Sequence, residues 1–236
     1  MATRSAAVGV LLAMLSFGGC MSPAPGPTPI ASMGVLRYVA LGDSYTIGTS
    51  VNEAERWPNQ LVDRLGPAAP TLALVANLGV NGRTSGDLIR DQLPRLDGLR
   101  PGFASLLIGV NDLVQGVPIE AYRANLETIL DALLARLPAG RIVAVSIPDY
   151  TVTLAGADYG DPARQSAAIR ADNAILGELA AARGIAFVDI YDLSLRAADD
   201  PALVADDGLH PSGAQYALWV GRIAPVVATL IGRAGP

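Results

Sequence analysis

Three residues of this sequence together have the chemistry of a nucleophilic catalyst: Ser44, Asp207 and His210. A serine hydroxyl becomes a good nucleophile when an imidazole takes its proton, and the imidazole needs a carboxylate to orient it. His210 is the only histidine of the chain, and Asp207 precedes it by a spacing at which one turn of helix would bring the carboxylate to Nδ1. The set predicts acyl transfer through a covalent intermediate on Ser44.

Acyl transfer also needs fixed hydrogen-bond donors that stabilise the negative charge developing on the attacked oxygen. The sequence offers three candidates: the backbone N–H of Ser44, the backbone N–H of Gly82 and the side-chain amide of Asn111. Gly82 suits this role because a residue without Cβ lets the backbone approach a substrate closely. We therefore expect these groups to form an oxyanion hole.

Each of these residues also has an ordinary structural interpretation. Ser44 could cap the helix that follows it, and Asn111 could do the same before another helix. His210 precedes a proline and could be a structural residue at a helix start, and Asp207 could be a loop carboxylate like Asp206. The chemistries complement one another, however, and the catalytic hypothesis explains all of them together.

The elements that must position these side chains alternate along the chain. Short apolar runs typical of strands buried on both faces cover 35–41, 71–76, 104–110, 141–147 and 185–190. Helical patterns cover 119–137, with an apolar stripe from Ile119 to Leu137, as well as 162–184 and 211–232. Within the last of these, Pro225 predicts a kink or break.

This alternation predicts an α/β fold with a five-stranded parallel sheet and helices on both faces. Function collects at the carboxyl ends of the strands in such sheets. Ser44, Gly82 and Asn111 each follow a different predicted strand, and Asp207 and His210 follow the fifth beyond a loop. The fourth strand is followed by Asp149, for which the sequence shows no evident partner.

The composition excludes several other kinds of site. The chain has one cysteine, one histidine and no lysine among its 236 residues. A zinc site built from Cys and His clusters, an internal disulfide, a Ser-Lys dyad and a Walker-type phosphate loop are therefore excluded. The net charge is −5 with no basic run, which argues against nucleic acid as a partner. We expect no metal and no cofactor.

The N-terminal segment has the features of an export signal. Arg4 precedes a short apolar stretch, and two glycines precede Cys20, in a pattern that resembles a bacterial lipoprotein signal. We expect residues 1–19 to be the signal, 20–34 to be a proline-rich tether and 35–236 to be the folded domain. The chain would then be held in the cell envelope by a lipid on Cys20. An ordinary signal peptide with an incidental cysteine, and hence a secreted protein, is the alternative.

The sequence blocks around these residues resemble those of the SGNH/GDSL hydrolase family of esterases and lipases. "GDS" at Ser44 is similar to the first block, "NLGVNG" with Gly82 to the second, "GVND" with Asn111 to the third, and "DDGLHP" with Asp207 and His210 to the fifth. The resemblance runs from about Val35 to the C-terminal helix. The Gly-x-Ser-x-Gly pattern of α/β-hydrolases is not met, because Thr46 stands where its second glycine would be.

The resemblance implies a flavodoxin-like three-layer α/β/α domain and a serine esterase that needs no metal. Its substrate would be a small-molecule ester: a short-chain acyl ester, a lysophospholipid or an acetylated carbohydrate. The modest loop between Pro148 and Asp161, with no long apolar insertion, favours short acyl chains. An acyltransferase on the same site and a non-catalytic binding lipoprotein remain alternatives. We expect a monomer, attached to the membrane only through its lipid.

Overall fold

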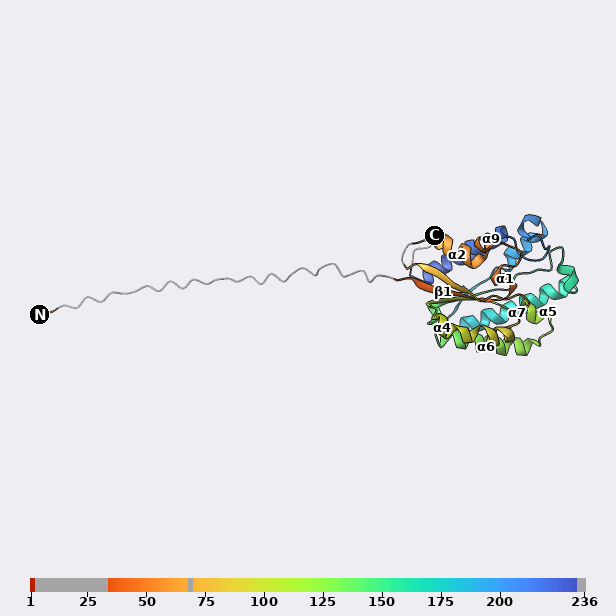
Figure 1. Ribbon diagram of the computed structural model, residues 1–236. Coiled ribbons are helices and arrows are strands. Elements are labelled where there is room, and N and C mark those ends of the chain that lie inside the picture. The colour runs from red at the N-terminus through yellow and green to blue at the C-terminus, as the bar shows by residue number, and fades with distance from the viewer. Residues whose placement is uncertain (3–33, 68–69, 233–236) are drawn as a thin grey trace. The chain divides into compact units, whose positions relative to one another are not determined.

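The computed structural model describes residues 1–2, 34–67 and 70–232, and its helices and strands all belong to the unit Ser32–Pro236 (Figure 1). Cys20 and nearly all of the expected signal and tether lie outside the described residues, so the expectations about export and lipidation stay predictions. Within the described part of the chain, no helix is both long and apolar enough to cross a lipid bilayer.

A five-stranded, fully parallel sheet forms the centre of the domain, with strand order β2-β1-β3-β4-β5. The strands are β1 (Leu36–Gly42), β2 (Leu72–Asn77), β3 (Phe103–Leu107), β4 (Ile142–Val145) and β5 (Ala186–Val188). The predicted five-stranded parallel sheet is therefore confirmed. The order places β1 between β2 and β3, with Ala40 beside Asn77 and Gly42 beside Leu107. β3 thus ends opposite the last residue of β1, and β2 ends two residues earlier, so the carboxyl ends of the three strands lie close together.

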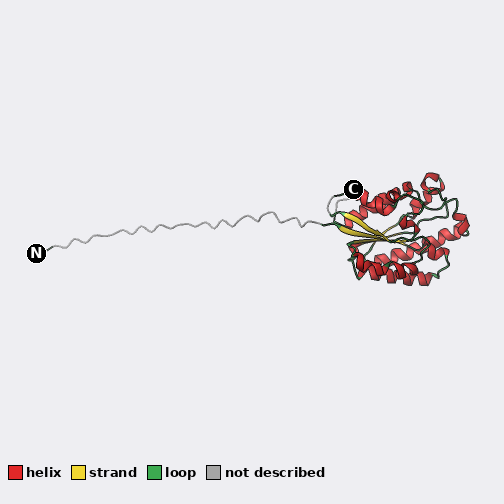
Figure 2. Cartoon of the chain, viewed as in Figure 1, coloured by secondary structure: helices red, strands yellow, loops and turns green. Residues whose placement is uncertain are grey.

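Helices cover both faces of the sheet, which makes the predicted three-layer α/β/α arrangement (Figure 2). One face carries α2 (Trp57–Leu65), packed against α9 (Gly213–Leu230). The other face carries α3 (Ser85–Asp91), α6 (Ile119–Leu134) and α7 (Pro162–Ala182), packed against one another in that order. Short helices follow several strands: α1 (Ser44–Ile47), α4 (Leu96–Leu99), α5 (Val110–Val114) and α8 (Tyr191–Ser194).

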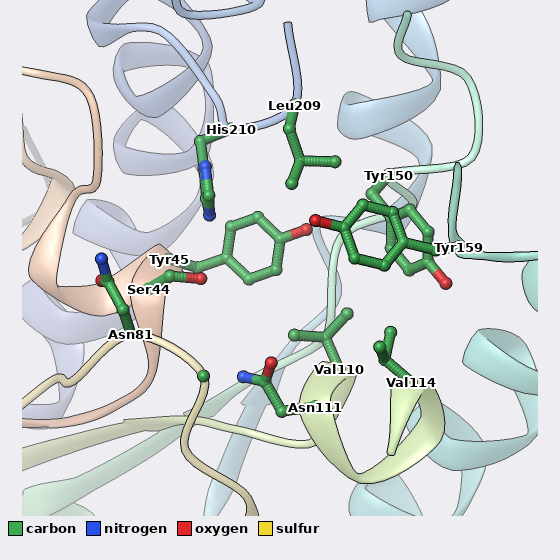
Figure 3. Close-up of a pocket in the computed structure, with 11 residues that line it drawn as sticks. Ser44, Tyr45, Asn81, Val110, Asn111, Val114, Tyr150, Tyr159, Leu209 and His210 are labelled. Atoms are coloured by element: carbon green, nitrogen blue, oxygen red, sulfur yellow. The ribbon is translucent and has the colours of Figure 1, made fainter. Parts of the chain in front are cut away.

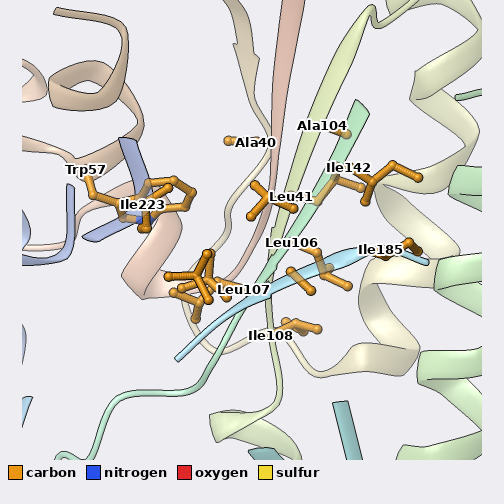
Figure 4. Close-up of a cluster of buried hydrophobic side chains, with 14 of the residues drawn as sticks. Ala40, Leu41, Trp57, Ala104, Leu106, Leu107, Ile108, Ile142, Ile185 and Ile223 are labelled. Atoms are coloured by element: carbon orange, nitrogen blue, oxygen red, sulfur yellow. The ribbon is translucent and has the colours of Figure 1, made fainter. Parts of the chain in front are cut away.

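The core lies where the strands meet these two helix layers. Every residue of β3 and β4 is buried, as near-continuous apolar runs predict for strands covered on both faces. Figure 4 shows Trp57 of α2 and Ile223 of α9 together on one side of the strands and Ile142 of β4 on the other side, and all three side chains are fully buried. A sheet buried in this way holds its strand ends in fixed positions, and therefore also the loops that follow them.

Two details of the helices differ from expectation. Ile119 was expected on the buried stripe but is 44% exposed, because it is the first residue of α6 and precedes the turns that pack on the sheet. Helix α9 was expected to kink or break at Pro225; it does not break there, because it continues through that residue to Leu230. A hydroxyl of Thr229 donates to the carbonyl of Pro225 within this helix.

The loop after β2 packs tightly against the segment that carries Ser44. The side-chain amide of Asn77 donates to the carbonyl of Thr46 at 2.7 Å, and its Oδ1 accepts from the backbone N–H of Gly79 at 3.0 Å. A Cβ on Gly79 would lie 2.5 Å from the backbone nitrogen of Ile47 and 2.7 Å from the carbonyl oxygen of Asp43. Only glycine therefore lets the two backbones approach this closely.

We expect Gly79→Ala to lower the free energy of unfolding by about 1–3 kcal/mol, because the new methyl group meets backbone and not a flexible side chain. Gly98→Ala is the matched control: Gly98 lies within α4, and a methyl group added to it would meet no atom within 4 Å. In a helix that change should be neutral or stabilising by up to about 1 kcal/mol. Thermal unfolding followed by circular dichroism measures both. Equal melting temperatures for the two variants would contradict the close approach at Gly79.

Candidate active site

The structure brings Ser44, Asp207 and His210 to one end of the sheet. Nδ1 of His210 lies 2.6 Å from Oδ2 of Asp207. Both Ser44 and His210 line the same cavity, and Figure 3 shows the imidazole pointing from the loop above toward the side chain of Ser44. The imidazole thus lies between the carboxylate and the serine, as the spacing of these residues in the sequence predicted.

The local structure at Asp207 is a tight loop and not the turn of helix that was expected. Oδ1 of Asp207 accepts the backbone N–H groups of Leu209 and His210, both at 2.9 Å, in the manner of an Asx turn. The loop is closed by a hydrogen bond of 2.8 Å from the N–H of Ala205 to the carbonyl of His210. The neighbouring residue, Asp206, is exposed and lines a separate hollow on the surface.

Hydrogen bonds keep the carboxylate of Asp207 ionised. Partial burial acts to raise its pKa, but donors outweigh that effect: the hydroxyl of Ser50, the backbone of His210 and Leu209, and the imidazole. Together they hold the pKa of Asp207 far below the ordinary value for an aspartate. A permanent negative charge at this place is what a positively charged imidazolium needs for stabilisation.

Ser44 is not the cap of the helix that follows it. The cap of α1 is Asp43, whose Oδ1 accepts the backbone N–H of Tyr45 at 3.0 Å, and Ser44 is the first helical residue. Asp43 is fully buried, and the loss of hydration raises its pKa to about 7 in spite of this hydrogen bond. The cap at Asp43 leaves the hydroxyl of Ser44 without a structural task and facing the cavity.

The two other expected oxyanion donors lie on segments that are tied together. Nε2 of Gln115 donates to the carbonyl of Gly82 at 2.8 Å, and Nδ2 of Asn111 donates to the carbonyl of Arg83 at 3.1 Å. An amide nitrogen carries two hydrogens, so Asn111 keeps a second donor for the cavity that it lines with Gly82 and Ser44.

Gly82 has a backbone φ of +74°, in the left-handed region that is unfavourable for residues with a Cβ. A Cβ there would meet no atom of the protein within 4 Å. The conformation of the loop therefore favours glycine at this position, and the expected close approach of its backbone to a substrate stays a prediction.

Aromatic residues that the sequence analysis missed complete the cavity. Tyr45 lies edge-to-face against His210, with ring centroids 5.8 Å apart and planes at 61°. Tyr150 and Tyr159 pack against each other at 5.6 Å and form the far wall with Val110 and Val114 (Figure 3). Asn81 and Leu209 complete the lining, and the cavity has a volume of about 180 Å³. Of these aromatic residues, only Tyr45 could have been placed near the site from the sequence, because it directly follows Ser44.

The segment that carries Tyr150 and Tyr159 is attached to the loop that carries His210. The backbone N–H of Ala155 donates to the carbonyl of Gly208 at 3.0 Å. Leu154 lies beside Gly208, and its side chain is 91% exposed. The aromatic wall of the cavity and the Asp207–His210 loop therefore form one connected rim.

Asp149, which was expected to have no partner, has several. Its Oδ1 accepts from Thr151, and its Oδ2 accepts the hydroxyls of Ser166 at 2.6 Å and Tyr191 at 2.8 Å. These bonds fix the start of the segment that carries the aromatic wall. Asp149 is thus a structural residue, and it does not line the cavity. Among the described residues, no group of three or more Cys, His, Asp or Glu side chains is placed to hold a metal ion.

Comparisons with known proteins agree with this arrangement. Residues 40–218 match the sequence model of the GDSL-like lipase/acylhydrolase family, a range that contains every residue of the cavity. A search of curated protein sequences gives no match.

Solved structures share the fold at low sequence identity. LAE5, an α/β hydrolase from the metagenome of Lake Arreo, is 20% identical with a TM-score of 0.64, and the match covers 87% of this chain and all of LAE5. Esterase EstA from Pseudoalteromonas sp. is 18% identical with a TM-score of 0.63, over 84% of this chain and all of EstA. A variant of Axe2, an acetylxylan esterase from Geobacillus stearothermophilus, is 18% identical with a TM-score of 0.64, over 84% of this chain and 94% of Axe2.

The family match covers well over half of the chain, and the matched range contains Ser44, Gly82, Asn111, Asp207 and His210. The resemblance seen in the sequence is therefore confirmed, and with it the enzyme class, a carboxylic ester hydrolase. This chain belongs to the GDSL-like lipase/acylhydrolase family.

Proposed function

We propose that this enzyme hydrolyses uncharged carboxylic esters with a short acyl group, through an acyl intermediate on Ser44. The observation that carries the proposal is the placement of His210, whose Nδ1 is bonded to Asp207 while its ring points at Ser44 in the cavity. With Nδ1–H donated to the carboxylate, Nε2 is the acceptor, so the imidazole can take the proton of the serine hydroxyl.

The reaction runs in two steps. Ser44 Oγ attacks the ester carbonyl as its proton passes to Nε2 of His210, and collapse of the tetrahedral intermediate returns that proton to the leaving alcohol. A water molecule then gives its proton to His210 and attacks the acyl-serine, which frees the carboxylic acid and restores Ser44. The negative charge of Asp207 stabilises the imidazolium in both steps.

The oxyanion in each step is stabilised by the backbone N–H groups of Ser44 and Gly82 and by the amide of Asn111. All three residues line the cavity, and the bonds from Asn111 and Gln115 to the Gly82–Arg83 backbone hold two of the donors in a fixed relation. Donors that are already in place cost no reorganisation when the charge develops.

The size of the cavity supports a short acyl group. Its volume of about 180 Å³ is close to that of an engineered protein cavity of about 150 Å³ that holds one benzene molecule. A chain of up to about six carbon atoms has a comparable size by the same comparison. Val110, Val114 and the two tyrosines of the far wall would surround it with apolar and aromatic surface.

The lining also supports an uncharged substrate. Among the residues that the structure describes, those that line the cavity include no arginine, aspartate or glutamate. Burial raises the pKa of Tyr150 to about 12 and that of Tyr45 well above the ordinary value, so both phenols stay neutral at physiological pH. A charged acyl group would lose hydration here without gaining a partner.

Ser44→Ala should reduce ester turnover by roughly a million-fold, the loss seen when the nucleophile of a catalytic triad is removed. It should also abolish covalent labelling by a fluorophosphonate probe. Hydrolysis of p-nitrophenyl butyrate and in-gel fluorescence measure the two effects on protein whose fold is checked by circular dichroism. Labelling that persists in Ser44→Ala would assign the nucleophile to another serine.

The two adjacent carboxylates should differ sharply. Asp207→Asn should lower kcat by up to roughly ten-thousandfold, because an amide cannot stabilise the imidazolium or fix its tautomer. Asp206→Asn should leave kcat within about twofold, as expected for a surface change away from the reacting groups. Steady-state kinetics at one pH compares them, and a larger loss in Asp206→Asn would show that the assigned carboxylate is wrong.

Activity against p-nitrophenyl esters should be highest from acetate to hexanoate and fall steeply for octanoate and decanoate, since longer chains exceed the cavity. Tyr159→Ala opens the far wall and should shift the profile toward longer chains. Leu154→Ala is the matched control, because this residue lies in the same segment but outside the cavity lining. An optimum at decanoate in the unmodified enzyme, or equal shifts in both variants, would refute the assignment of this cavity to the acyl group.

A further inference from the structure

Ser50 has an unusual backbone conformation close to the proposed catalytic residues. Among the described residues other than glycine, only Ser50 and Arg100 have a positive φ, 64° and 46° respectively. The left-handed region is unfavourable for residues with a Cβ, and glycine or asparagine usually occupies such positions. A serine kept in this conformation suggests that its side chain has a task that glycine could not perform.

The side chain of Ser50 contacts the carboxylate that orients His210. Its hydroxyl donates to Oδ2 of Asp207 at 2.6 Å. The same oxygen lies 2.6 Å from Nδ1 of His210, while Oδ1 accepts two backbone N–H groups. The carboxylate therefore has four donors, two on each oxygen, and Ser50 is the one that comes from a distant part of the sequence.

The backbone around Ser50 connects this hydroxyl to the nucleophile. The carbonyl of Ser44 accepts the N–H groups of Gly48 at 3.0 Å and Thr49 at 3.1 Å, which ends α1 in a tight turn. Ser50 is the next residue after that turn, and the hydroxyl of Thr49 is held by Asn81 at 2.6 Å. The position of the hydroxyl is thus set by the same short segment that sets the position of Ser44.

We propose that Ser50 is a positioning residue of this active site, whose hydroxyl fixes the orientation of the Asp207 carboxylate toward Nδ1 of His210. The Asx turn holds Oδ1, and without Ser50 the remaining oxygen is held only by the imidazole that it is meant to orient. The left-handed backbone places the hydroxyl where no glycine could supply one. This inference rests on the proposed function, because it assigns Asp207 to the orientation of a catalytic base.

The position of Ser50 predicts which kinetic constant it affects. Ser50 does not line the acyl cavity, and it lines a separate hollow on the surface together with Asp206. A residue that never touches the substrate should leave KM nearly unchanged and act on kcat. The hydrogen bond lies in a partly exposed place, so its loss should be much milder than that of the carboxylate, roughly tenfold in kcat.

The test uses Ser50→Gly, Ser50→Ala and the control Arg100→Gly in the full chain. Ser50→Gly removes the hydroxyl and relieves the backbone, whereas Ser50→Ala removes the hydroxyl and keeps the unfavourable conformation. Both should lower kcat for p-nitrophenyl butyrate roughly tenfold with KM within about twofold, and Ser50→Gly should melt no lower than the unmodified enzyme. Arg100→Gly relieves the other strained residue, which is exposed, and should leave kcat unchanged.

Proton NMR gives a readout that does not depend on turnover. The Nδ1–H of a histidine bonded to a carboxylate gives a far-downfield resonance, and with one histidine in the chain its assignment is unambiguous. This resonance should move in both Ser50 variants, because Oδ2 then has a single side-chain donor, and should stay in place in Arg100→Gly.

Unchanged kcat and an unchanged resonance in Ser50→Gly would overturn the proposal, and so would a kcat loss in Ser50→Ala that Ser50→Gly restores. If the unmodified enzyme had no esterase activity the proposed function would fail, and the resonance would still decide the role of Ser50.

Discussion

The active site depends on the alignment of three parallel strand ends. With β1 between β2 and β3, the register places Gly42 beside Leu107 and Ala40 beside Asn77, so the segments after all three strands begin within two residues of one another along the sheet. Chain segments that are far apart in the sequence thereby deliver Ser44, Gly82 and Asn111 to the same cavity. The buried core holds the strands in place, and the residues that follow the strands are held in place with them.

The hydrogen bonds between the loops show how this alignment is refined. Side chains of Asn77, Gln92 and Gln115 bind the backbone of neighbouring segments, with Gln92 pairing to both the N–H and the carbonyl of Gly42 at 3.1 and 2.7 Å. Each is an uncharged amide. Amides can satisfy a backbone donor and acceptor together without adding a charge near the reacting groups. These amides thus add no charge beside the buried carboxyl of Asp43, whose pKa is raised by loss of hydration, or beside the ionised carboxylate of Asp207.

Much of the fold and the positions of the reactive residues could be predicted from the sequence, because both follow from simple patterns. Apolar runs located all five strands to within a few residues, and the rule that strand ends converge grouped Ser44, Gly82 and Asn111. The spacing of Asp207 and His210 correctly predicted the contact between their side chains, but it predicted a turn of helix where the structure has an Asx turn. Both local structures bring the carboxylate to Nδ1. The aromatic wall was missed because Tyr150 and Tyr159 lie in an irregular segment without periodicity. Ser50 was missed because a positive φ and a long-range contact leave no mark on residue type.

The hydrogen bond from Ala155 to the carbonyl of Gly208 has a consequence for how such an enzyme can diversify. The segment with the aromatic wall can vary at the side chains that face the cavity, since loops tolerate substitutions, but not at Gly156, where a Cβ would collide with the carbonyl of Tyr150. The anchor itself is not free, because it also supports the loop that presents His210. If the cavity binds the acyl group as proposed, changes at Tyr150 or Tyr159 alter acyl specificity, whereas a deletion that removes Ala155 disturbs the proposed base His210 together with the wall. Selection for a new substrate would therefore act on Tyr150 and Tyr159, and selection for turnover on the anchor at Ala155, which lies between them in the same segment.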